Sequence, residues 1–301
     1  LAGPGGLVVT GAAVLTLSAD NTFTGSLRVA QGTVRIAAAF LRGHNGLTIA
    51  ADAAVEISSN LQISVGAANP SIGVTGAGVL RLTSTGSNSN TPDLYFGPNH
   101  TGNSFWGARV DTTLDLGDRQ RFVFGKTGHN GVGTYGVAGA DCQFAGSIIG
   151  SGGLTLIGQN DWNAGMGVPF SLNGTNTFSG PMDIRRGSLY LGSDGALTNA
   201  NVLKFNAPAG QVARFFLWGR TATVADLQSP GAGAALIADG AVGTPAGVGP
   251  GTLRVFSSND TTFAGSLVDF HAEYGTPAGT QTARLQLVKS GPAQLTLTGT
   301  N

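Results

Sequence analysis

The sequence Asn-Thr-Phe-Thr-Gly at 21–25 returns almost unchanged as Asn-Thr-Phe-Ser-Gly at 176–180. In each copy a second glycine follows at the same distance and begins a run that alternates apolar and polar residues. A phrase that recurs with its glycine spacing predicts stacked, similar backbone units. The positions that define it are Asn21, Phe23, Gly25 and Gly32 in the first copy and Asn176, Phe178, Gly180 and Gly187 in the second.

Two shorter echoes extend the pattern. Phe144 and Gly146 stand in Phe-Ala-Gly-Ser-Ile, and Phe263 and Gly265 stand in Phe-Ala-Gly-Ser-Leu. The last residues, 295–301, stop where another Thr-Phe-x-Gly is due. We therefore expect the chain to be a segment of a longer repetitive protein.

Short strands account for almost the whole sequence. Runs such as Leu-Arg-Val-Ala at 27–30 and Val-Glu-Ile-Ser at 55–58 alternate apolar and polar residues, which is typical of strands with one buried side. Asn-Gly and Asp-Gly pairs would suit hairpins, but longer glycine-bearing corners link most strands. We predict an all-β chain that folds as a parallel β-helix, a solenoid with roughly 20–25 residues per rung and about 12–15 rungs.

Composition excludes several classes of protein. Lys and Arg together number 16, as do Asp and Glu, and only 11% of residues are charged. Because a basic excess is missing, we expect no nucleic-acid partner. No apolar run reaches the length of a membrane-spanning helix. The one cysteine, Cys142, excludes an intrachain disulfide and is expected to be a small buried hydrophobic residue.

The residues also resemble a known family. The runs Gly-Gly-Leu-Thr-Leu-Ile-Gly at 152–158 and 172–197 are similar to the autotransporter-associated β-strand repeat, with weaker likeness at 1–36 and 285–301. That resemblance implies a right-handed β-helix exported to the bacterial surface, and it carries over no catalytic residues. We predict one continuous β-helical segment over 1–301, with loops or irregular insertions near 84–110, 160–168 and 206–250.

Candidate chemical sites are weak. Gly131 to Gly136 match G-x-G-x-x-G, but a short strand follows where a dinucleotide site needs a helix. Asp111, Asp115 and Asp118 lie close together in sequence with Arg119 and Arg121, and capping of turns explains them more simply than catalysis. The four histidines are scattered, and we expect no catalytic residues, no metal and no cofactor.

One aromatic stretch offers a different role. Tyr95, Phe96, Phe105 and Trp106 lie among glycines and could form a protruding loop that recognises a sugar or a protein. The alternative is that these rings pad the column of stacked strands. Phe-Phe-Leu-Trp at 215–218 is expected to be a core strand.

The leading functional hypothesis is a non-enzymatic, extracellular structural or adhesive rod at a bacterial cell surface. Its expected partners are further repeats of the same protein or another copy, and a cell-surface or glycan ligand. A β-helical polysaccharide lyase or hydrolase is the first alternative, since such enzymes place acidic residues on neighbouring rungs. A phage-type fibre, which should trimerise, is the other.

Overall fold

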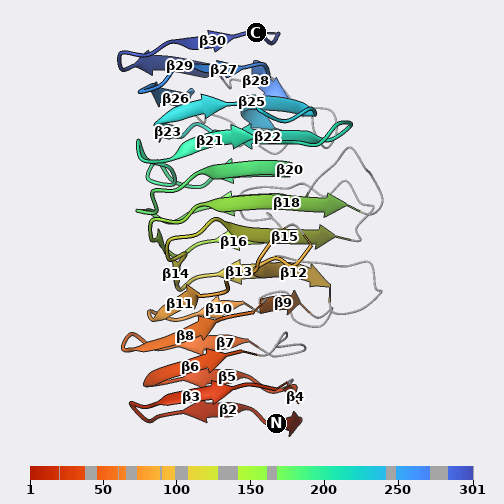
Figure 1. Cartoon of the computed structure of the whole chain (residues 1–301), viewed down its shortest axis with the longest axis vertical. Coiled ribbons are helices and arrows are strands. Elements are labelled where there is room, and N and C mark those ends of the chain that lie inside the picture. Colours follow the sequence, from red (N-terminus) through yellow and green to blue (C-terminus); the bar gives the residue numbers. More distant parts are fainter. Residues whose placement is uncertain are drawn as a thin grey trace.

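The protein is known from a computed structural model that describes residues 1–19, 21–37, 46–59, 61–65, 73–88, 90–98, 108–127, 142–160, 168–241, 249–271 and 284–300. Within these ranges the regular elements are all β-strands, and they pair in parallel. Figure 1 shows the strands in tiers along the longest axis, with the two termini at opposite ends. The all-β prediction is confirmed for the described residues.

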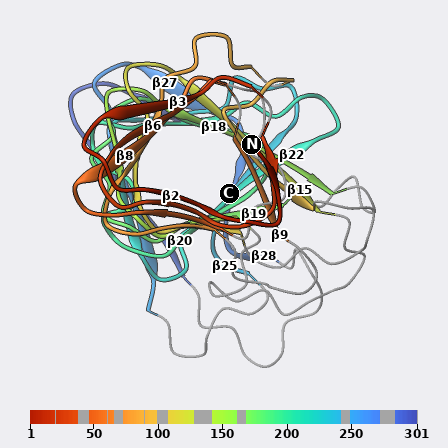
Figure 2. The same cartoon turned by 90° about the horizontal axis from the view of Figure 1, so that it is seen from below.

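Successive strands occupy three positions in a repeating order, although some rungs lack a described strand at one position. Leu7 of one strand pairs with Leu27 and then with Leu47, each 20 residues further along the chain. We call one passage through the three positions a rung and the stacked strands of one position a face. Seen along the long axis, the rungs superimpose as a ring (Figure 2).

Face 1 holds eleven strands in the described part of the chain, and they run in register from the first rung to the last. It consists of β2 (Leu7–Val9), β5 (Leu27–Val29), β7 (Leu47–Ile49), β10 (Val74–Thr75), β13 (Ala108–Val110), β16 (Cys142–Phe144), β19 (Pro169–Leu172), the second half of β20 (Met182–Leu191), β22 (Val212–Phe216), β25 (Ala234–Ala241) and β28 (Ser266–His271).

Face 2 follows face 1 in the chain. Its first six strands form one sheet, and three later strands take the same place in the order. It consists of β3 (Val14–Leu17), β6 (Gly32–Ile36), β8 (Ala53–Ile57), β11 (Val79–Leu82), β14 (Thr113–Asp115), β17 (Ile148–Ile149), β23 (Thr221–Val224), β26 (Gly251–Phe256) and β29 (Leu285–Ser290).

Face 3 completes each rung. The long strand β20 runs through faces 3 and 1, because its first residues pair with β21 and its last with β22. Face 3 consists of β1 (Ala2–Gly3), β4 (Thr22–Phe23), β9 (Leu61–Val65), β12 (Leu94–Pro98), β15 (Arg121–Thr127), β18 (Leu154–Asn160), the first half of β20, β21 (Val202–Phe205), β24 (Asp226–Gln228), β27 (Thr261–Phe263) and β30 (Leu295–Leu297).

The core is a set of side-chain columns inside the ring. Parallel pairing keeps the inward positions aligned, so apolar side chains stack on their counterparts one rung away. On face 3 one column is buried throughout and runs Leu61, Leu94, Val123, Leu156, Ile184, Phe205. Each fully buried side chain of this size contributes about 1.5–3 kcal/mol of apolar transfer free energy.

Rung length varies more than the sequence predicts. Paired residues of face 1 lie 19 residues apart at Leu172 and Leu191 but 36 apart at Val74 and Val110. Eleven face 1 strands therefore appear in the described residues, where about 12–15 rungs were predicted.

Two of the three predicted insertions need correction. The stretch 206–250 contains the regular strands β22 to β25, and 84–110 contains β12 and β13. Their inward side chains continue the core columns. In β22 and β25 buried outer positions hide the polar alternation, whereas β12 and β13 are too short for alternation to reveal them. Residues 99–107, 161–167 and 242–248 lie outside the described residues.

Candidate functional site

The repeated phrase places a buried asparagine where the chain turns between strands. The Asn176 side chain is buried, and its Oδ1 accepts the backbone N–H of Ile148 at 2.8 Å. Its Nδ2 donates to the carbonyl oxygen of Ala196 at 2.9 Å. One amide thus joins three consecutive rungs. Asn21 Oδ1 accepts in the same way from the amino group of Leu1 at 2.9 Å.

The phenylalanine and glycine of the phrase serve packing. Phe178 is fully buried, and Phe23 is nearly so. At Gly180 a Cβ would stand 2.4 Å from the backbone of Gly152, so the two rungs approach too closely for any side chain. Gly187 has φ of 94°, a left-handed conformation that favours glycine. Both glycines are therefore required by backbone geometry.

The copies of the phrase lie on different faces of the ring, so they do not stack directly on one another. Leu15–Leu17 and Phe170–Leu172 each stand six residues before the phrase asparagine, and Leu295–Leu297 stand six residues before Asn301. The first segment lies in β3 on face 2, the second in β19 on face 1 and the third in β30 on face 3. The repeat describes a strand, a corner and the next strand, and it fits any face.

The shorter echoes follow the same rule. Phe263 is buried on β27 of face 3, where its ring contacts Phe205 with centroids 5.4 Å apart. Phe144 is buried on β16 of face 1. At Gly146 and Gly265 a Cβ would collide with a neighbouring rung, as at Gly180.

The predicted recognition loop is wrong for Tyr95 and Phe96. Both residues lie in strand β12, and Phe96 points into the core against Phe144, with ring centroids 5.7 Å apart. Tyr95 is half-buried on the outer side and stacks on Phe124 of the next rung, with centroids 5.4 Å apart. The padding interpretation fits Phe96. Phe105 and Trp106 lie outside the described residues.

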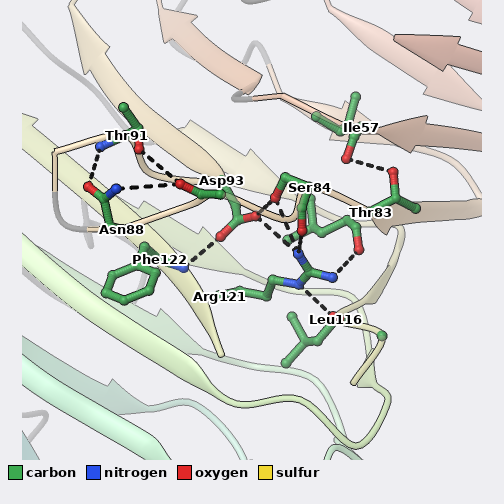
Figure 3. Close-up of polar contacts among 12 residues, drawn as sticks. Ile57, Thr83, Ser84, Asn88, Thr91, Asp93, Leu116, Arg121 and Phe122 are labelled. Atoms are coloured by element: carbon green, nitrogen blue, oxygen red, sulfur yellow. Dashed lines mark hydrogen bonds and ion pairs between the residues drawn. The ribbon is translucent and has the colours of Figure 1, made fainter. Parts of the chain in front are cut away.

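A buried ion pair forms the densest polar site in the described structure (Figure 3). Arg121, at the start of β15, points inward, and its Nη1 lies 3.3 Å from Asp93 Oδ1, with side-chain exposures of 3% and 0%. Its Nε donates to Leu116 O at 2.6 Å, and its Nη1 donates to Ser84 O at 2.7 Å. Nη2 donates to Leu82 O.

The other oxygen of Asp93 is also satisfied. Oδ2 accepts the backbone N–H of Phe122 at 2.8 Å, and the Ser84 hydroxyl bonds to Oδ1. Buried charges are stable when they are paired and hydrogen-bonded, which is the case here. Because both charged side chains are enclosed, the cluster holds rungs together and offers no surface to a substrate. Sequence reasoning missed it, since Asp93 and Arg121 are 28 residues apart.

The predicted acidic cluster at 111–118 separates into two parts. Asp111 pairs with Arg109 on the outside. Asp115 caps a turn, because its Oδ1 accepts the N–H of Gly117 at 2.9 Å, and its Oδ2 lies 2.9 Å from Arg81 Nε. The turn-capping interpretation is confirmed for Asp115.

Asp115 ends a ladder of alternating charge on the outer side of face 2. Arg35, Glu56, Arg81 and Asp115 stand in register on four successive strands. Arg35 Nη2 lies 2.9 Å from Glu56, and Arg81 Nη1 lies 3.3 Å from Glu56. The hydrogen bond to Asp115 raises the pKa of Arg81. A shift of one residue in the pairing of these strands would turn a charged side chain toward the core, so the ladder favours the observed register.

A second apolar cluster lies outside the ring on face 1. Tyr190 stacks on Phe216 with centroids 4.7 Å apart, and Trp218 contacts Tyr190 at 5.4 Å. Trp218 has φ of 56°, and its backbone N–H donates to the carbonyl oxygen of Asp239 at 2.7 Å. His271 stacks on Phe216, and burial lowers its pKa, with the positive charge of Arg214 adding to the effect. The run 215–218 is therefore buried as expected, but Phe215 and Leu217 belong to the inner core while Phe216 and Trp218 belong to the outer cluster.

One further acid is perturbed. Burial raises the pKa of Asp183 on β20, and Arg185, whose Nε lies 3.1 Å from Asp183 Oδ2, opposes that rise.

Two other kinds of site are missing from the part of the chain that the structure describes. No group of three or more His, Cys, Asp or Glu side chains there could hold a metal ion. No helix in that part of the chain is long and apolar enough to cross a membrane. His44, His100, His129 and the G-x-G-x-x-G match at 131–136 lie outside it.

Comparison with protein families decides what the repeat is. The passenger-associated-transport-repeat profile matches residues 7–36, 170–191 and 287–301. These three segments match a repeat family of autotransporter passengers. They contain both full copies of the phrase and the incomplete one, so the family resemblance is confirmed. Autotransporter passengers are secreted or cell-surface proteins. Comparison with curated proteins and with solved structures gives no match.

Proposed function

We propose that the chain is a segment of a right-handed parallel β-helix and serves as an extracellular, non-enzymatic rod of a bacterial surface protein. The observation that carries this proposal is the passage of passenger repeats through all three faces of one continuous core. A scaffold needs only such columns, whereas catalysis needs convergent polar groups at an accessible place. The one dense polar cluster described is enclosed.

The rod is proposed to continue by stacking. At the first and last described rungs, Leu7, Leu15, Leu295 and Leu297 pack on the core yet stay partly exposed. Unpaired strand edges at such ends accept further strands. Further repeats of the same protein, or another copy, are the proposed occupants. An adhesive role toward a cell-surface or glycan ligand would use the outer sides of the rungs.

Two measurements test the rod. Negative-stain electron microscopy of the purified chain should show straight particles about 4.8 Å long per rung. An antibody against the chain should label intact, unpermeabilised cells of the source bacterium. Globular particles would contradict the rod, and labelling only after permeabilisation would contradict the surface location.

A third measurement separates the scaffold from the lyase or hydrolase alternative. The chain is incubated with a panel of acidic and neutral polysaccharides, and release of reducing ends is followed. We expect none above a heat-denatured control. Turnover that Asp183→Asn abolishes, with the fold retained, would overturn the non-enzymatic proposal.

A further inference from the structure

The outer side of face 2 carries a charge sequence with a simple symmetry. From the N-terminal side, its four successive rungs read Arg35, Glu56, Arg81, Asp115. The arginines stand outermost, with side-chain exposures of 50% and 41% against 17% and 18% for the acids. When the four residues are read from Asp115 to Arg35, each position has the charge opposite to that in the forward order.

Beside the ladder runs a second outward line of small side chains. Val14, Thr33, Ala54, Val79 and Thr113 are in register on the same strands, two residues before the ladder positions. On the outer side of face 2, Arg35 and Arg81 are the longest side chains of these four rungs. The outer side of face 2 is therefore a long, nearly flat surface against which a second surface of the same shape could pack.

We propose that face 2 binds face 2 of a second copy of this chain, with the two rods antiparallel. The two-fold axis runs along the strands and passes between the rungs of Glu56 and Arg81. It sets Arg35 opposite Asp115 of the second copy and Glu56 opposite Arg81. All four positions then face an opposite charge, because rungs are evenly spaced at about 4.8 Å. A contact of this kind is isologous, with the same patch on both molecules.

Chemistry favours the antiparallel arrangement over the parallel one. Parallel rods would place each rung opposite its own counterpart, Arg35 against Arg35 and Glu56 against Glu56, and like charges in contact cost several kcal/mol. Each guanidinium has five N–H donors. Arg35 uses Nε and Nη2 for Glu56, which leaves Nη1 outside the ladder contacts for a carboxylate of the second copy.

The proposed dimer should be weak, because a single charge ladder joins the two copies, and its affinity should fall as salt is added. Exposed ion pairs contribute about 0.2–1 kcal/mol each, and the Debye length falls from about 10 Å at 0.1 M to about 3 Å at 1 M salt. The proposal concerns the side of the rod, so it is independent of the stacking proposed for its ends and of the enzymatic question.

The decisive experiment inverts the ladder. In R35E/E56R/R81E/D115R every ion pair within the chain keeps opposite signs. The variant loses the turn cap from Asp115 to the Gly117 N–H, so its free energy of unfolding should fall by about 1 kcal/mol. Inverted chains should pair with one another, whereas an inverted chain facing the wild type antiparallel meets like charges throughout. Sedimentation velocity at low ionic strength should show dimers of each chain alone. Fluorescence energy transfer should show mixed dimers at least fivefold below the statistical fraction.

Parallel rods predict the reverse result, with mixed dimers in excess. That outcome, or mixed dimers at the statistical fraction, would overturn the proposal, as would a wild type that stays monomeric at low ionic strength and high concentration. Dimers joined at their ends would persist at 1 M salt and would mix freely, since the end rungs are shared by both chains.

A cross-link tests the register without the inverted chain. The two-fold axis sets Thr33 opposite Thr113 of the second copy. Under mild oxidation, a mixture of T33C and T113C should form a disulfide between unlike chains, and either variant alone should form at least fivefold less. Cys142 is buried, and the wild type serves as its control. Cross-linking of T33C to itself would contradict the antiparallel register.

Discussion

The first rungs, 7–57, and the later rungs, 142–241, solve the same packing problem differently. In the first region, rungs of 20 residues pair through short strands such as β5 and β7. Their buried side chains are mostly Val, Leu and Ile, and their outer sides are wet. In the second region β20 is ten residues long, and Phe170 and Phe215 enter the inner column. Outer positions there are buried as well.

The first region therefore keeps regular rungs of 20 residues with an apolar column on the inner side alone. Where the outer side is exposed, as at Arg28 and Thr48, the strand alternates visibly and the sequence reveals it. Where Tyr190 and Phe216 are buried outside the ring, the same backbone carries a second apolar cluster. A region with two clusters is expected to unfold at higher free energy than a region with one.

The largest loss of stability is expected from a substitution at the junction between the two regions, where Arg121 is buried. Arg121→Met leaves Asp93 charged and unpaired inside the ring and removes the donors to Leu82 O, Ser84 O and Leu116 O. Loss of one partner of a buried ion pair costs about 3–5 kcal/mol. Urea unfolding should therefore shift to lower concentration and split into two transitions, because the regions lose their coupling.

Two variants give this test its controls. Arg109→Met removes an exposed ion pair with Asp111 and should shift unfolding by at most about 1 kcal/mol. The double variant Asp93→Leu/Arg121→Met leaves no buried charge, so it should recover part of the loss. An Arg121→Met protein that unfolds in one transition at the wild-type midpoint would show that the junction couples nothing.

The next largest loss of stability is expected at corners where the backbones of neighbouring rungs approach closely. In Gly180→Ala the new methyl group would lie 2.4 Å from backbone atoms of Gly152, so the rungs must move apart. Overpacking of this kind costs about 1–3 kcal/mol. Gly86→Ala meets open space and should change the free energy of unfolding by less than about 0.5 kcal/mol. Equal melting temperatures for the two variants would contradict the close approach.

The sequence predicted the parts of this molecule that repeat locally. The strands, the buried Phe178 and the need for Gly180 follow from spacing, because a strand and its corner are encoded by adjacent residues. The sequence does not predict the face on which each repeat lies. Rungs vary from 19 to 36 residues in length, and these differences add up along the chain. The Asp93–Arg121 pair was hidden for the same reason, as its partners lie in different rungs.

A smaller change in the free energy of unfolding is expected on the solvent-exposed side of the first region. Glu56→Gln weakens contacts with Arg35 and Arg81, and all three side chains touch solvent. The expected loss is at most about 1 kcal/mol at low ionic strength and close to nil at 1 M salt. Asp52→Asn, at an exposed position of the preceding turn, is the control. A loss that salt leaves unchanged would point to packing and not to charge.

The smallest effect concerns His271 at the edge of the second region. Its folded pKa lies below the ordinary value of 6.5, because burial and Arg214 disfavour the proton. The unfolded chain therefore binds the proton more readily as pH falls. This contribution to stability is complete above about pH 6.5 and is lost as pH falls through the folded pKa.

Replacement of His271 separates this group from the others. His271→Gln should flatten the decline in unfolding free energy between about pH 7 and 5, measured by urea titration at each pH. Asp183 cannot mimic the signal, since its raised pKa makes its contribution run in the opposite direction, lost as pH rises. If the variant and the wild type decline in parallel, the stack on Phe216 leaves the histidine as free to protonate as it is in the unfolded chain. The outer cluster would then be open to water at its edge, and the difference between the two regions would narrow to their inner columns.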